Sequence, residues 1–136
     1  MTPFQLQGLV ASLYLIIDSI YVTQSRSIYE ERIKAIQKMG YPSDKAGALT
    51  IAILSFLVVA LAWWVLVAER VTAQTSYLEA FRLALVLALA IYGVFNGTLY
   101  VAFKEWNTAI FIRDLLWGIT LLTFLTLLYL YSLRHI

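Results

Sequence analysis

The pattern of apolar and polar positions divides the chain into four long apolar stretches joined by short polar connections. The stretches cover about residues 4–22, 46–68, 78–103 and 108–131. Each has about the 20 residues that an α-helix needs to cross the hydrocarbon core of a bilayer. The pattern therefore predicts an all-α fold with one membrane domain over residues 1–136, a bundle of four transmembrane helices.

Turn and capping signals lie between these stretches. Gly40-Tyr41-Pro42-Ser43 predicts a turn before the second stretch, because glycine and proline end helices and serine can cap the next one. The third stretch begins after Ser76, which stands three residues before Glu79 in the spacing of a capping box. The fourth is expected to begin near Asn107.

The connection after the first stretch has its own helical pattern. Between residues 25 and 39, apolar side chains recur at helical spacing while charged side chains of both signs occupy the remaining positions. This arrangement predicts an amphipathic helix. It is expected to lie on the membrane surface, and docking onto a partner subunit is the alternative.

Composition places the chain among membrane proteins. Hydrophobic residues make up 62% of it and charged residues 13%, and the mean hydropathy is +0.81, values outside ordinary soluble usage. The first stretch is expected to remain as a span rather than to be cleaved, because Asp18 interrupts it and no basic segment precedes it. A net charge of +2 without a dense basic run argues against nucleic-acid binding.

Charge in the connections predicts an orientation. The connections after spans one and three are richer in lysine and arginine than the other side of the bundle, which has Arg70, Arg82 and Arg134. By the positive-inside rule, both richer connections face the cytoplasm and both termini lie on the opposite side.

Four polar residues near the ends of apolar stretches form the candidate site: Asp18, Asn96, Arg113 and Asp114. At 1.5 Å per residue along each helix, they share a similar depth in the predicted bundle. Because a charged carboxylate is costly there, Asp114 is expected to face Asp18 and Asn96, with the two carboxyls sharing a proton. Arg113 is expected to extend to the membrane interface.

This cluster has two interpretations. It could hold helices together by interhelical hydrogen bonds, each worth about 0.6 to 2 kcal/mol. It could instead bind or move a proton or ion, since ionisable groups inside membranes are often functional.

Small residues predict close helix packing. Ala80, Ala84 and Ala88 repeat every four residues, and Gly93 and Gly97 form a GxxxG pattern. Gly118 of the fourth stretch is expected to serve the same purpose. The leucine-rich segment 121–130, by contrast, is expected to face lipid or to pack without a specific partner. Six aromatic residues near span ends are expected at the headgroup boundary, namely Trp63, Trp64, Tyr77, Trp106, Tyr129 and Tyr131.

Several short motifs, taken in order, resemble a known family. They are Asp18-Ser19-Ile20-Tyr21, Ile33-Lys34-Ala35-Ile36-Gln37, Tyr92-Gly93-Val94-Phe95-Asn96-Gly97-Thr98, Lys104-Glu105-Trp106 and Asp114-Leu115-Leu116-Trp117-Gly118. Together they resemble a family of predicted four-helix integral membrane proteins known only as a domain of unknown function, with bacterial, protist and large DNA virus members. The resemblance implies the four-helix fold and no established activity, and it raises the possibility of a viral membrane protein.

The chain departs from that family's pattern in span three. The family usually has an acid where this chain has Asn96, and an amide where it has Leu99. The polar cluster of this chain is therefore depleted of one acid, which favours a structural role.

No residue pattern indicates enzymatic chemistry. His135 is the only histidine and lies next to the C-terminal residue, cysteine is absent, and no spacing resembles a metal site. No metal or other cofactor is expected. The sequence favours a non-enzymatic structural or interaction subunit of a membrane assembly, whose partners, besides the bilayer, bind at the amphipathic helix or the small-residue face of span three. A small transporter or channel using the polar cluster is the alternative.

Overall fold

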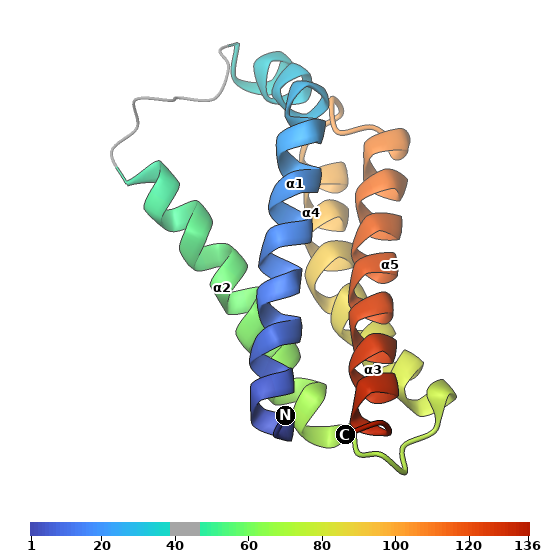
Figure 1. Cartoon of the computed structure of the whole chain (residues 1–136). Helices are drawn as coiled ribbons and strands as arrows, with labels where there is room; N and C mark the ends of the chain where they lie inside the picture. Colours follow the sequence, from blue (N-terminus) through green and yellow to red (C-terminus); the bar gives the residue numbers. More distant parts are fainter. Residues whose placement is uncertain (39–46) are drawn as a thin grey trace.

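The computed structural model describes residues 1–38 and 47–136, and within them the chain is a bundle of long helices (Figure 1). Four helical segments are long and apolar enough to cross a membrane, which confirms the predicted all-α membrane fold. In chain order the elements are α1 (Pro3–Gln37), α2 (Ala48–Leu66), η1 (Ala68–Arg70), α3 (Tyr77–Ala88), η2 (Leu89–Gly93), α4 (Val94–Ala102) and α5 (Thr108–Leu133).

Side-chain caps fix the starts of three helices. Thr2 and Gln5 form a reciprocal capping box at the start of α1. Ser76 Oγ accepts a hydrogen bond from the Glu79 backbone N–H at 3.1 Å, and Asn107 Oδ1 accepts one from the Ile110 N–H at 3.1 Å. These contacts satisfy backbone donors that have no partner inside the helix. The turn predicted at residues 40–43 and the start of span two at residue 46 lie outside the described residues.

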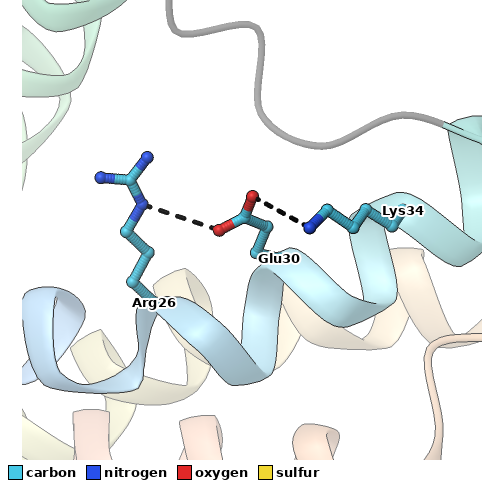
Figure 2. A network of polar contacts seen from close by, with 3 residues as sticks. All are labelled: Arg26, Glu30 and Lys34. Carbon is cyan, nitrogen blue, oxygen red and sulfur yellow. Dashed lines mark ion pairs between the residues drawn. The ribbon is translucent and has the colours of Figure 1, made fainter.

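The first span and the amphipathic segment form one continuous helix. No glycine or proline occurs between Gly8 and Lys38 to end it, and α1 therefore extends through residue 37. Figure 1 shows the last part of α1, in cyan, turning across the end of the bundle. On this part, Glu30 lies between Arg26 at 3.9 Å and Lys34 at 3.5 Å (Figure 2).

The third span is interrupted by a π-helical turn. η2, from Leu89 to Gly93, separates α3 from α4 without breaking the helical path. Single π-helical turns inside α-helices are rare and are frequent at functional sites. This turn contains Tyr92, which belongs to the site described below.

The last helix, α5, is the centre of the bundle. It packs against α1, η2 and α4, and most extensively against α3. The prediction that segment 121–130 faces lipid was wrong for one side of the helix, which is buried in the core at Leu121, Leu122, Leu125, Thr126, Tyr129 and Leu130.

Three aromatic residues expected at the headgroup boundary are core residues. Trp63 and Tyr129 are each 1% exposed and pack edge to face, with ring centroids 5.6 Å apart. Trp106 is also buried. Burial of these large rings stabilises the bundle interior, and their N–H and O–H groups then need internal partners.

The arrangement of the helices leaves one end of the bundle wider than the other. Both termini lie at the same end (Figure 1). There α2 approaches α1, whereas towards its N-terminal end α2 leans away from the rest of the bundle (Figure 1). Residues of α2 and of the other helices line a cavity in this part of the bundle, which is described below.

Candidate functional site

Asn96 and Asp114 meet in the bundle interior. The Asn96 side-chain amide donates a hydrogen bond to Asp114 Oδ2 and another to the Tyr92 carbonyl at 2.9 Å. Trp106 Nε1 donates to Asn96 Oδ1 at 3.1 Å, which orients the amide with its N–H groups towards Asp114. Tyr29 completes the set by donating to Asp114 Oδ1 at 2.6 Å.

Asp18 has a separate set of partners. Trp117 Nε1 donates to Asp18 Oδ1 at 2.8 Å, and the Tyr14 hydroxyl donates to Asp18 Oδ2 at 3.1 Å. The Tyr14 and Tyr92 hydroxyls lie 3.1 Å apart. Asp18 and Asp114 are 3% and 8% exposed, and each oxygen of the two carboxyl groups accepts a hydrogen bond.

The donors form two short relays. A tyrosine hydroxyl has one proton to donate. Since Tyr14 gives its proton to Asp18, Tyr92 must donate to Tyr14. The same reasoning applies to Asp114: Tyr29 donates to it, so the Tyr21 hydroxyl, 3.2 Å away, donates to Tyr29. Each aspartate is thus reached by two tyrosines in series.

Neither aspartate has a cationic partner within residues 1–38 and 47–136. The ion pairs among the described residues involve neither Asp18 nor Asp114. The two carboxyls also form no direct hydrogen bond with each other in this part of the chain, and the expected shared proton stays a prediction. Arg113 donates to the buried Ser25 Oγ at 3.1 Å and lies 5.8 Å from the Tyr21 ring centroid.

The π-helical turn and Gly118 together place Tyr92. A Cβ added at Gly118 would fall 2.7 Å from Tyr92 Cε2 and closer still to two other ring atoms. The ring therefore lies directly on the α5 backbone, where only glycine leaves room for it. This close approach brings the Tyr92 hydroxyl to Tyr14.

A cavity of about 580 Å³ lies beside both aspartates. Its walls come from α1, α2, the third span, Trp106 and α5. They consist of Tyr14, Asp18, Tyr21, Val22, Tyr29, Ile33, Ser55, Phe56, Val59, Ile91, Tyr92, Phe95, Leu99, Trp106 and Asp114. We call it the acidic cavity. Its volume is within the range of small-molecule sites, about 300 to 1,000 Å³.

A packed layer separates the acidic cavity from the end of the bundle that carries the termini. Val10, Trp63, Leu122 and Leu125 are each 1% exposed or less in this layer. Beyond it, a second cavity of about 560 Å³ is lined by residues near both termini and by Tyr129.

The small residues predicted to pack helices differ in their surroundings. Ala80, Ala84 and Ala88 are fully buried inside the chain. A Cβ at Gly93 would meet Leu115 of α5 at 3.8 Å, whereas one at Gly97 would meet nothing within 4 Å. The GxxxG pattern therefore has one glycine at an internal contact and one on an open face.

Sequence reasoning identified Asn96 as a partner of Asp114 but did not identify the tyrosine and tryptophan partners of the two aspartates. Tyr14 stands four residues before Asp18, a spacing that places two side chains together on a helix. This signal could have found it. Tyr29 and Trp117 lie 85 and 99 residues from the aspartates they contact, and no local pattern indicates such pairs.

The described residues contain no group of three or more His, Cys, Asp or Glu side chains arranged to hold a metal ion. His135 Nδ1 lies 2.6 Å from the Tyr131 carbonyl at the end of α5 and is exposed. It does not reach the acidic cavity, whose lining includes no histidine.

Comparison with known proteins gives one match. A family model described as Predicted membrane protein (DUF2177) matches residues 6–131. The comparisons found no matching curated protein and no matching solved structure. The match covers nearly the whole chain and all four spans, and it confirms the resemblance indicated by the ordered motifs.

Proposed function

The chain belongs to the DUF2177 family of predicted membrane proteins, and from this premise we propose that it is a small non-enzymatic transporter that takes up a proton or cation in the acidic cavity. One observation carries the proposal. Asp18 and Asp114 line a cavity of about 580 Å³ and have only neutral hydrogen-bond partners among the described residues.

Electrostatics favours a positively charged ligand at this place. A carboxylate in an apolar environment gains stability from any cation that approaches it, because little solvent screens the attraction. Tyrosine, tryptophan and asparagine donors keep the two side chains in position without neutralising them. A cation or proton in the cavity would supply the missing charge.

The two cavities support a carrier rather than an open channel. They lie on either side of the layer that contains Trp63, and Tyr129 lines the cavity nearer the termini. A carrier exposes its site to one side of the membrane at a time. In this structure, packed side chains close the acidic cavity off from the side of the membrane that carries the termini, as expected for a carrier whose site is closed to that side.

The chemistry of the cavity favours a non-enzymatic role. Its lining combines carboxylates, phenols, an indole, one serine and apolar side chains. Ser55, the only aliphatic hydroxyl among the described lining residues, donates to the Ile51 carbonyl at 2.8 Å and has no base beside it among the described contacts. An activated nucleophile requires such a base.

A structural subunit is the second candidate function. It is favoured by the complete hydrogen bonding of both carboxyl groups, which is what a purely stabilising cluster requires. Partner subunits would then bind at the amphipathic part of α1 or at the open face of α4 around Gly97, because Ala80, Ala84 and Ala88 are already buried within the chain.

Proton flux in proteoliposomes separates the two candidates. With a pH-sensitive dye inside the vesicles and an imposed potential, the full chain is expected to conduct protons, and Asp18→Asn to lose most of that flux. Glu79→Gln removes an acid from the exposed first turn of α3 and is expected to retain it. If folded wild-type protein gives no flux above empty vesicles, or Asp18→Asn keeps the full flux, the transporter proposal is wrong.

A further inference from the structure

Aromatic side chains make up much of the lining of the acidic cavity. Seven of its fifteen described lining residues are phenylalanine, tyrosine or tryptophan, contributed by α1, α2, the third span and the connection before α5. The faces of aromatic rings attract cations, and cages of such rings recognise quaternary ammonium groups in particular. Aromatic rings also bury apolar groups well.

The described residues place no positive side chain in this cavity. No lysine or arginine of residues 1–38 and 47–136 belongs to its lining. Arg113, next in sequence to Asp114, is directed to Ser25 and the Tyr21 ring. The described walls therefore carry two acids and no basic group, and they would repel an anionic ligand while attracting a cationic one.

The cavity can be reached from the side of the bundle. Phe95 and Val22 line it and are 55% and 39% exposed on the apolar surface of the spans. α2 leans away from the other helices at this end (Figure 1). Because these lining residues are exposed on the apolar surface, a molecule dissolved in the bilayer could enter the cavity there without crossing water.

From these three observations we infer that the acidic cavity binds a hydrophobic organic cation, an ammonium or phosphonium centre with apolar or aromatic groups, taken laterally from the bilayer. The positive centre lies near Asp18 and Asp114, and the apolar groups pack against rings such as Phe56 and Phe95. This inference rests on the proposed function and names the class of its ligand.

Binding of tetraphenylphosphonium to the full chain in nanodiscs tests the inference. Tetraphenylborate, an anion of nearly the same shape, is the matched control for charge. The chain is expected to bind the cation and not the anion above the level of protein-free nanodiscs. Asp18→Asn and Asp114→Asn are each expected to weaken binding by on the order of tenfold or more, whereas Glu79→Gln leaves it unchanged.

A pair of tryptophan substitutions tests the location without altering the polar network. Ser55 of α2 lines the cavity. Ser12 of α1 is exposed and lies outside the cavity. The two serines are matched, because each hydroxyl donates a hydrogen bond at 2.8 Å to the backbone carbonyl four residues earlier in its helix. Ser55→Trp fills part of the cavity and is expected to abolish binding, and Ser12→Trp is expected to preserve it. Size-exclusion profiles show which variants fold.

Equal binding of phosphonium and borate would overturn the inference, and so would phosphonium binding that survives Ser55→Trp. Proton flux that depends on Asp18 without any phosphonium binding would refute the ligand class and leave the proposed transporter in place. Absence of both flux and binding in the folded wild-type chain would refute the proposed function itself.

Discussion

Gly118 of α5 lies directly against the ring of Tyr92, the residue of the π-helical turn whose hydroxyl reaches Tyr14. A methyl group at position 118 would overlap the ring, and the Tyr92 side chain or the helix would have to move. The packing of one glycine and the hydrogen bonding of Asp18 are therefore linked through a single side chain.

Gly118→Ala is accordingly expected to destabilise the bundle. Forcing a methyl group into a packed contact typically costs about 1 to 3 kcal/mol. Thermal unfolding in detergent, followed by helical circular dichroism, measures the effect. The matched control is Gly97→Ala, where the added Cβ has nothing within 4 Å. At position 97, helix propensity predicts a gain in stability of up to about 1 kcal/mol. An equal loss of stability in both variants would contradict the packing argument.

Asn96→Leu tests the connection between Asp114 and Trp106. The change removes the amide that donates to Asp114 and the oxygen that accepts from Trp106 Nε1. Each buried polar group left without a partner costs about 1 to 3 kcal/mol. A clear fall in the unfolding midpoint is expected, measured by the same denaturation assay.

Thr98→Val is the control on the same helix, because Thr98 is exposed. It is expected to leave the midpoint almost unchanged. A midpoint for Asn96→Leu equal to that of the control would show that Asn96 does not hold this part of the network together.

The number of spans and their helical class could be predicted from the sequence because both depend on local properties. A run of about 20 apolar residues has few alternatives to a membrane helix. The buried acids Asp18 and Asp114 were also visible in the sequence as polar interruptions of apolar stretches. Asn96 was selected because it lies at a similar depth along its helix, and it does contact Asp114.

The inward face of α5 could not be predicted in the same way. Residues 121–130 are almost uniformly apolar, and lipid and protein interior are equally apolar surroundings, so no contrast in polarity marks the face that packs. Two partners of the aspartates could not be predicted for a different reason. Tyr29 and Trp117 are brought to them by helix packing over long sequence separations, and a single sequence carries no local signal for such contacts.

Thr126→Val tests the hydrogen bond inside the packed layer. Trp63 Nε1 donates to Thr126 Oγ1 at 2.9 Å, and both side chains are buried. Valine keeps the shape but removes the acceptor. The cost is expected to be about 0.6 to 2 kcal/mol, the range for interhelical hydrogen bonds in membranes.

Thr123→Val is the matched control for that change. The buried Thr123 Oγ1 has no hydrogen-bond partner among the described residues, so its removal is expected to leave stability unchanged or slightly raise it. Denaturation of both variants under identical detergent conditions gives the comparison. Equal destabilisation by the two changes would mean that the Trp63 contact contributes nothing beyond the volume of the side chain.

The orientation predicted from the charged connections is testable with single cysteines, because the native chain contains none. Lys34→Cys and Lys104→Cys lie at the wider end of the bundle and Ala73→Cys near the termini, and all three positions are exposed. By the positive-inside rule, a membrane-impermeant maleimide is expected to label the first two only from the cytoplasmic side and Ala73→Cys only from the opposite side.

The reverse pattern would invert the orientation and place the acidic cavity in the outer half of the membrane. Labelling of Lys34→Cys and Lys104→Cys from different sides would contradict the four-span topology, because both connections follow an odd-numbered span.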